Sequence, residues 1–153
     1  MTPTQQKAIS EFFKAILGLR QTGIIRSQRY LADLGEFLCA DTFGIDLARS
    51  LREVGHDGLR GAVRVQVKYH GGKSTTANLG NPDQYDEVYL VLGPDSVLRP
   101  KGLAEDFLIY QFAATAVKKF ESSKSVGNHY CTKARIPTNP VRKISLSVSE
   151  VKA

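Results

Sequence analysis

The chain has 153 residues, of which 42% are hydrophobic and 24% are charged, a composition typical of one soluble domain. No apolar run approaches the ~20 residues needed to span a bilayer, and the charges within residues 1–20 do not fit a signal peptide, so we expect a cytoplasmic protein without a membrane partner. Two cysteines, Cys39 and Cys131, are too few for a disulfide scaffold or a four-ligand zinc site, and both should be reduced.

The formal net charge is +6 and is unevenly distributed. Residues 1–117 hold 13 basic and 13 acidic residues, whereas residues 118–153 hold 8 basic and 2 acidic residues. A neutral body with a basic segment indicates a polyanionic partner, most simply nucleic acid. The alternative is a solvated surface that aids solubility. We interpret residues 1–153 as a single domain with a basic C-terminal segment, residues 118–153.

The first 43 residues predict two helices. Thr2, Pro3 and Gln5 form a capping-box pattern, so the first helix should begin there and end near Gly23. A second helix is predicted from Ser27 to about Phe43. One of its faces carries small residues beside one acid, at the helical spacing of Ala32, Gly35, Glu36 and Cys39. A close approach of another element would explain the glycine, and a cation or a paired base would explain the acid.

Strands dominate the middle of the predicted fold. Residues 63–70 alternate strictly between apolar and polar side chains, and residues 88–92 form a continuous apolar run typical of a strand covered on both faces. The remaining predictions are a strand within 45–54, a polar loop over 71–82, a pairing strand at 97–98, a helix over 103–120 and a strand over 144–148. Together they predict an α/β fold with a mixed central sheet flanked by helices.

The polar face of residues 63–70 offers a candidate site. Gln66 and Lys68 leave the same side of the strand, and a hairpin would bring Asp57 within their reach. Carboxylate and amide oxygens suit a hard divalent cation, and the lysine ammonium can stabilise charge that develops on a phosphate. Glu36 could add a further oxygen ligand. Each residue also has an ordinary alternative, because Asp before Gly is a common turn residue and Lys68 could protect an edge strand.

These residues resemble the core of the PD-(D/E)XK nuclease superfamily, a small bacterial or phage branch of it. The resemblance covers about residues 27–112 and rests on the Gly-Glu helix, then Asp57, then Gln66-Val67-Lys68 on an apolar strand. It implies a restriction-endonuclease-like fold. It also implies that Asp57 is the central metal ligand, that Gln66 and the main-chain carbonyl of Val67 are further ligands, that Lys68 is the catalytic lysine and that Glu36 is the accessory acid.

The resemblance implies a Mg²⁺-dependent (or Mn²⁺-dependent) endonuclease that hydrolyses DNA phosphodiester bonds in restriction, phage defence or repair. Gln66 replaces the usual acid and carries no charge, which weakens metal binding. The alternative is therefore a catalytically weak or inactive nucleic-acid-binding module, and a structural or regulatory protein is a third reading. A homodimer is left open. Six side chains are expected to contact nucleic acid: His70, Lys73, Lys133, Arg135, Arg142 and Lys143.

Overall fold

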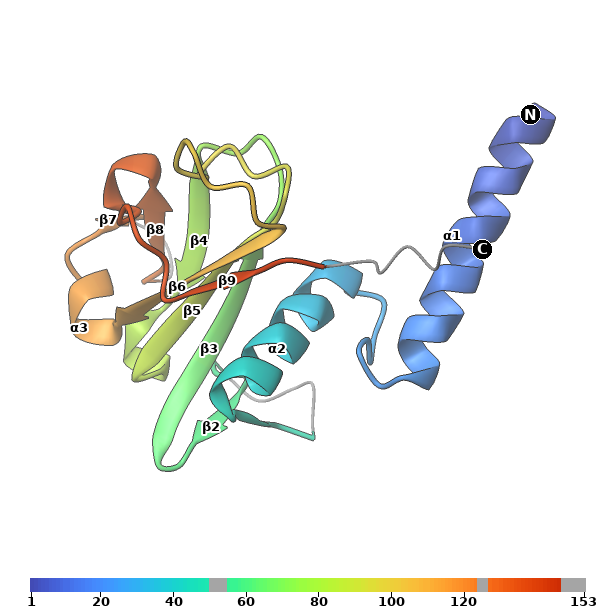
Figure 1. The fold of residues 1–153 in the computed structure, drawn as a ribbon. Helices are drawn as coiled ribbons and strands as arrows, with labels where there is room; N and C mark the ends of the chain where they lie inside the picture. The colour runs from blue at the N-terminus through green and yellow to red at the C-terminus, as the bar shows by residue number, and fades with distance from the viewer. Residues whose placement is uncertain (50–54, 124–126, 147–153) are drawn as a thin grey trace.

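The computed structural model describes residues 1–49, 55–123 and 127–146 and shows a mixed α/β protein. Two N-terminal helices precede a six-stranded mixed sheet and a small three-stranded antiparallel sheet (Figure 1). The prediction of a mixed sheet with helices is confirmed at this level. Within the described ranges, no helix combines the length and the apolar character that crossing a membrane requires.

Helix α1 (Pro3–Gln21) begins as its sequence predicts. The Thr2 hydroxyl accepts the backbone N–H of Gln5 at 3.2 Å, and the Gln5 side chain accepts the backbone N–H of Thr2 at 2.9 Å. This reciprocal capping box satisfies two of the N–H groups that a helix start leaves without partners. Gly23 follows the helix with φ +74°, a conformation that favours glycine.

Helix α2 (Tyr30–Phe43) begins later than predicted, because Ser27 is not its cap. Arg29 occupies the N-cap position without a side-chain capping bond. Ser27 belongs to a turn that the Asp33 carboxylate holds by accepting the backbone N–H groups of Arg26 at 2.8 Å and Ser27 at 2.6 Å. The helix ends at Phe43, as expected, and Gly44 follows in the left-handed conformation.

The six-stranded sheet has the order β1-β2-β3-β5-β6-β9. Strands β3 and β5 are parallel, and the other neighbouring strands in this order are antiparallel. Its strands are β1 (Asp46–Leu47), β2 (Gly58–Arg60), β3 (Val63–His70), β5 (Glu87–Leu92), β6 (Phe107–Ala113) and β9 (Arg142–Ile144). The second sheet has the order β4-β8-β7, with β4 (Thr76–Gly80), β7 (Glu121–Ser122) and β8 (His129–Thr132).

The large sheet is covered on both faces, and each covering layer has its own hydrophobic cluster. Helix α2 packs over the face that carries Val65, Val67 and Tyr89. The small sheet and the short helix α3 (Ala114–Val117) cover the opposite face, which carries Val88 and Leu90 (Figure 1). Strand β5 is buried along its whole length, as its continuous apolar run predicts.

The helix predicted over residues 103–120 is wrong. Residues 107–113 form strand β6, and only Ala114–Val117 is helical. Phe107 and Ile109 face the α2 side of the sheet, while Leu108 and Tyr110 face the small sheet. Because both faces are apolar, the alternation that marks a strand is hidden in the sequence, and the run resembles a buried helix.

Four smaller predictions also change. The loop expected over residues 71–82 contains β4, which buries Ala77 and Leu79 on one side, and a single 3₁₀ turn (Pro82–Gln84) follows it. Residues 97–98 form no strand, although Leu98 is buried. The strand within 45–54 is limited to β1, with residues 50–54 outside the described part of the chain. Strand β9 begins before the predicted 144–148 strand and ends at Ile144, and residues 147–148 also lie outside the described part.

Candidate active site

The candidate site forms where strand β2 leaves β3. The hairpin pairs Gly58 with Val65, and the backbone N–H of Asp57 donates to the Val65 carbonyl at 2.8 Å. Strand β3 continues beyond this point without β2 beside it. In place of a strand, the Asp57 carboxylate accepts a hydrogen bond from the backbone N–H of Val67 at 2.7 Å. The fork of the hairpin thus fixes a carboxylate at the edge of the sheet, at the start of the exposed part of β3.

Gln66 and Lys68 extend the site along β3. The side-chain amide of Gln66 donates to the same Asp57 oxygen at 2.8 Å, and it lies 3.4 Å from the main-chain carbonyl of Val67. The Lys68 side chain passes Gly80 of β4, since a Cβ at Gly80 would lie 3.7 Å from its Cε. Lys68 forms no ion pair with any residue that the structure describes.

Glu36 enters the site from helix α2, whose small-residue face packs on β3. A Cβ on Gly35 would already be in van der Waals contact with Tyr69, at 3.5 Å. Glu36 is buried, and its carboxylate accepts a bond from the Arg26 guanidinium at 3.0 Å. Arg26 also donates to the main-chain carbonyl of Ala48 at 3.0 Å. The buried acid thus has a paired base, as its position on a packed helix face requires.

Both acids of the site hold protons more tightly than ordinary carboxyl groups. Burial is the main cause of the raised pKa of Glu36, and the charge of Asp57 adds to it, while Arg26 acts in the opposite direction. Burial also raises the pKa of Asp57, opposed by the Val67 N–H and by the charges of Lys68 and Arg29. The two acids affect each other unequally: the charge of Asp57 raises the pKa of Glu36, whereas the interaction with the Glu36 side chain lowers the pKa of Asp57.

The four predicted site residues line one cavity of about 530 Å³. Its wall consists of Arg29, Leu31, Ala32, Glu36, Asp57, Gln66, Val67, Lys68, Tyr69, Gly71 and Gly72. The structure therefore brings Glu36, Asp57, Gln66 and Lys68 together. It adds Arg29, whose side chain forms no ion pair within the described ranges.

Cys39 lies behind the acids and is fully buried, as predicted for a small core residue. Burial, together with the charges of Asp57 and Glu36, raises the pKa of its thiol to about 12. A thiol that holds its proton this tightly is a poor nucleophile at neutral pH. Cys39 is therefore a packing residue beside the site.

His70 does not face the cavity, contrary to the prediction that it contacts nucleic acid. Its ring is buried, with Nδ1 2.6 Å from the Ser96 hydroxyl and Nε2 2.9 Å from the Ser74 carbonyl. Both ring nitrogens are engaged, which leaves none for a phosphate. The alternation along β3 placed His70 with Gln66 and Lys68, but the small-sheet side of β3 is covered at this end.

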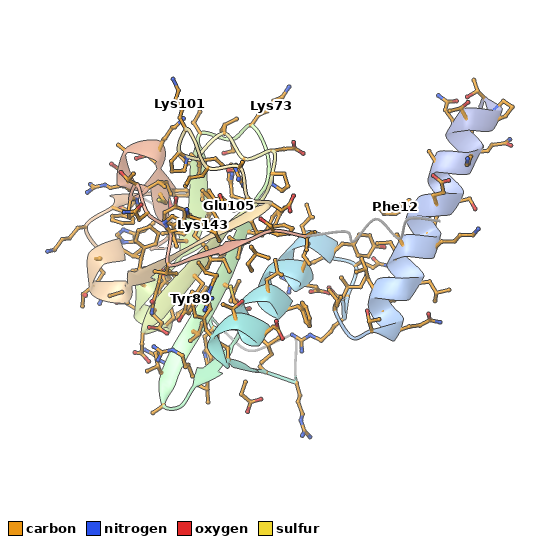
Figure 2. All side chains as sticks on the ribbon, viewed as in Figure 1. Phe12, Lys73, Tyr89, Lys101, Glu105 and Lys143 are labelled. Atoms are coloured by element: carbon orange, nitrogen blue, oxygen red, sulfur yellow. The ribbon has the colours of Figure 1, made fainter. Side chains whose placement is uncertain are left out.

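Lys73 lies on the exposed turn between β3 and β4, directly after Gly71 and Gly72 of the cavity wall. Figure 2 shows its side chain pointing into solvent at the same end of the molecule as Lys101. Its position next to the cavity leaves the predicted phosphate contact open to test.

None of the basic residues that the structure describes in the C-terminal segment lines this cavity. Arg135 pairs with Glu121 at 3.7 Å and lies over the Phe120 ring at 5.0 Å, and Lys143 pairs with Glu105 at 3.6 Å. Lys133 is exposed on a 3₁₀ turn (Lys133–Arg135). Part of the charge excess is therefore neutralised within the protein.

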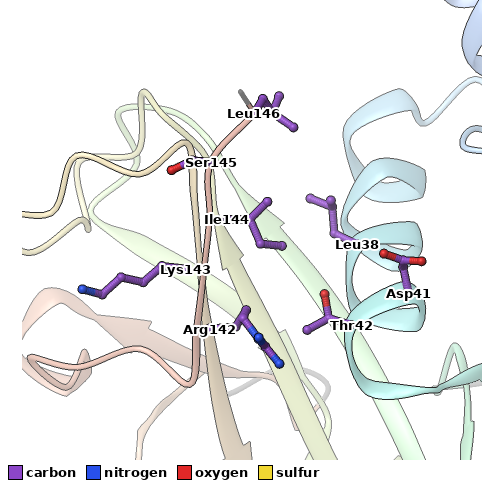
Figure 3. Close-up of a pocket in the computed structure, with 8 residues that line it drawn as sticks. All are labelled: Leu38, Asp41, Thr42, Arg142, Lys143, Ile144, Ser145 and Leu146. Carbon is purple, nitrogen blue, oxygen red and sulfur yellow. The ribbon is translucent and has the colours of Figure 1, made fainter. Parts of the chain in front are cut away.

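Arg142 lines a second cavity of about 630 Å³ between α2 and β9 (Figure 3). Leu38 and Ile144 point toward one another across it, and the Lys143 side chain points away from α2 (Figure 3). Leu38 and Glu36 are two residues apart on α2 and face different directions. A nucleic acid that contacts Arg142 therefore reaches a different side of α2 from the acid pair.

The donor set at the first cavity fits a hard divalent cation. It offers carboxylate oxygens from Glu36 and Asp57 and the carbonyl of Val67, which are ligand types that Mg²⁺ prefers, while Gln66 turns its amide nitrogen toward Asp57 and the Val67 carbonyl. Within the described ranges, no three His, Cys, Asp or Glu residues gather as a metal centre. A cation held here would need neutral oxygens beside the two carboxylates.

Sequence reasoning missed Arg26 and Arg29. Both precede α2, and neither has a motif or a spacing that relates it to Asp57 or Gln66. Their position depends on how the turn held by Asp33 folds back along α2. The basic character of the stretch from Arg26 to Arg29 was the only available signal.

A scan against protein-family models finds no model that matches this chain, and a search of curated proteins finds no relative.

Proposed function

We propose that this protein is a Mg²⁺-dependent endonuclease that hydrolyses DNA phosphodiester bonds. The observation that carries the proposal is the acid pair Glu36 and Asp57, which lines one cavity together with Lys68 and in which burial raises the pKa of both carboxyl groups. Two carboxyl groups that burial penalises as anions are suited to a divalent cation, whose charge favours the ionised form of both. The fork in the β2–β3 hairpin and the packing of the Gly-Glu helix on β3 support the resemblance to PD-(D/E)XK nucleases and their restriction-endonuclease-like fold.

In this proposal Asp57, Glu36, Gln66 and the Val67 carbonyl hold the metal ion. When bound, a divalent cation polarises the phosphate and lowers the pKa of its water. Asp57 must be ionised to bind the cation, and the Val67 N–H and Lys68 favour that form. Gln66 fixes the orientation of the Asp57 carboxylate through its 2.8 Å bond. Arg26 holds Glu36 in place.

Lys68 and Arg29 are the residues proposed to bind the substrate phosphate. Both line the cavity, and neither forms an ion pair within the described ranges. Lys68 follows Val67, whose N–H donates to Asp57, and its side chain lines the same cavity. In this proposal the Lys68 ammonium stabilises the negative charge that develops on the phosphate. Arg29 presents a planar guanidinium that suits bidentate phosphate binding.

One observation favours the alternative, a nucleic-acid-binding module with little or no catalysis. With both acids ionised, their two negative charges face three positive side chains: Arg26, Arg29 and Lys68. Gln66 presents its amide N–H groups to Asp57 and brings no charge. Such a site attracts a phosphate directly and has a weaker attraction for a cation.

Cleavage assays distinguish the two functions. Supercoiled plasmid and single-stranded DNA are incubated with the protein in Mg²⁺, Mn²⁺ or EDTA, beside the Lys68→Ala variant. Lys101→Ala is the matched control, since Lys101 is exposed and lies outside the cavity. The nuclease proposal expects metal-dependent cleavage that Lys68→Ala abolishes and Lys101→Ala retains. DNA binding without cleavage in either metal supports the binding module, and absence of both contradicts both functions.

A further inference from the structure

Helix α1 leaves an apolar face exposed to solvent. Ile9, Phe12, Phe13 and Leu17 are exposed by 49%, 48%, 60% and 55%, whereas Ile16 is buried. Figure 1 shows α1 standing apart from the sheets, and Figure 2 shows Phe12 on it. Half-exposed aromatic and aliphatic side chains in one continuous group indicate a binding surface, because monomeric proteins seldom leave such patches uncovered.

Among the described residues, contacts from the rest of the protein cover one edge of α1. The Phe12 ring meets Tyr30 edge-on with a centroid distance of 5.9 Å, and the Arg20 guanidinium lies over the same Tyr30 ring. These contacts anchor α1 to the start of α2. They leave the ridge formed by Ile9, Phe13 and Leu17 without a partner among the residues that the structure describes.

We propose that this ridge, defined as Ile9, Phe13 and Leu17, binds the same ridge of a second copy of the chain. The three residues are four positions apart and therefore form one row along the helix, with Phe13 at its centre. An antiparallel pair about a twofold axis brings Phe13 against Phe13 and Ile9 against Leu17. All opposing residues are then apolar and similar in size, as an isologous interface requires.

The charges of α1 agree with this arrangement. Lys7 and Glu11 pair with each other at 3.8 Å, on the opposite side of the helix from the ridge. In a twofold pair centred on Phe13, Lys14 and Glu11 each lie at the same height along the helix axis as an uncharged residue of the other copy. Arg20, the charged residue closest in direction to the ridge, is level with Gln6 of the other copy. No two like charges oppose each other across the pair.

The area is sufficient for a specific dimer at the lower end of the usual range. The ridge together with the neighbouring Phe12 exposes about 400 Å² of apolar surface per copy, taking about 200 Å² for a fully exposed side chain of this size. Because interface cores are about 65% apolar, this corresponds to about 600 Å² per copy and about 1,200 Å² in total. Stable interfaces begin at about 1,200 Å².

Sedimentation equilibrium of the full chain tests the proposal. The chain has a mass of 16.8 kDa, and we expect twice that mass at micromolar concentrations. Phe13→Lys should produce a monomer with unchanged circular dichroism. Ala15→Lys adds the same charge to the same helix but faces away from the ridge, so it should remain dimeric. A monomeric wild type, or a Phe13→Lys variant that is still dimeric, overturns the proposal.

A cysteine variant tests the symmetry and does not depend on the folding of Phe13→Lys. Both native cysteines are buried, so an introduced thiol is the accessible one. Phe13→Cys should form a disulfide-linked dimer under mild oxidation, because a central residue meets its own copy in an antiparallel twofold pair. Ala15→Cys should not. A dimer that Phe13→Cys fails to cross-link overturns the ridge arrangement, as does equal cross-linking by both variants.

Discussion

The backbone N–H of Val67 donates to the Asp57 carboxylate at 2.7 Å, in the place where a neighbouring strand would otherwise accept it. One oxygen of Asp57 also accepts the Gln66 side chain at 2.8 Å. The same carboxylate thus completes the edge of the sheet and faces the cavity. Stability and the proposed chemistry depend on different properties of it, because hydrogen bonding requires an oxygen whereas metal binding requires the charge.

Substitution of Asp57 should separate these two properties. Asp57→Asn keeps an oxygen acceptor for Val67 and Gln66 and removes a partly buried charge, so its free energy of unfolding should be at least that of the wild type. Asp57→Ala removes the acceptor and should lower the free energy of unfolding by about 1–3 kcal/mol. Both should lose metal-dependent cleavage. Urea denaturation checks the stabilities, and equal stability of Asn and Ala variants would contradict this role of the carboxylate.

Stability should fall as pH rises through the raised pKa values of Glu36 and Asp57. Burial raises the pKa of both groups in the folded state, so the folded protein binds protons that the unfolded chain has already released above about pH 4. The free energy of unfolding therefore falls as pH rises from about 4 to the raised pKa values of the folded state. Urea titrations between pH 4 and 8 should show this slope for the wild type and a smaller slope for Asp57→Asn. An identical slope in both proteins would show that Asp57 does not titrate anomalously.

Gln66→Glu should increase the affinity for metal and lower the stability of the metal-free protein. The new carboxylate supplies the missing negative charge at the second ligand position. It also removes the N–H group that donates to Asp57 at 2.8 Å and places a second negative charge beside that carboxylate. We expect stronger Mn²⁺ binding by calorimetry together with a lower melting temperature in EDTA that Mn²⁺ restores. Equal Mn²⁺ affinity in both proteins would mean that Gln66 does not touch the metal.

The basic residues of the C-terminal segment should contribute unequally to nucleic-acid binding. Arg135 and Lys143 pair with Glu121 and Glu105, whereas Lys133 and Arg142 form no ion pair within the described ranges. The Lys133→Ala, Arg142→Ala double variant should weaken DNA binding and flatten its salt dependence by about two units, one per lost phosphate contact.

The Arg135→Ala, Lys143→Ala double variant should have a smaller effect on the salt slope, since each residue already has a carboxylate partner. Fluorescence anisotropy at several salt concentrations checks both variants. Unchanged affinity in both, with circular dichroism intact, would show that the segment only aids solubility.

Local sequence patterns were sufficient to predict the elements that depend on contacts between residues close in the chain. The Thr2–Gln5 capping box and the alternation of residues 63–70 each involve atoms within a few positions along the chain, and both are confirmed. The juxtaposition of Asp57 with Gln66 is also local, because a short hairpin joins them. The sequence by itself therefore determined the first helix, strand β3 and most of the candidate site.

Tertiary packing decided the rest. Residues 107–113 have the same apolar composition as a buried helix, and only the layers on both faces of the sheet make them a strand. His70 follows the polar alternation of β3 but is buried by Ser74 and Ser96 from later segments. Arg26 and Arg29 reach the acids through the fold of a turn. In each case the deciding contact joins residues that are not related by a helical or strand repeat. Its contribution to the free energy of folding therefore cannot be inferred from a short stretch of sequence.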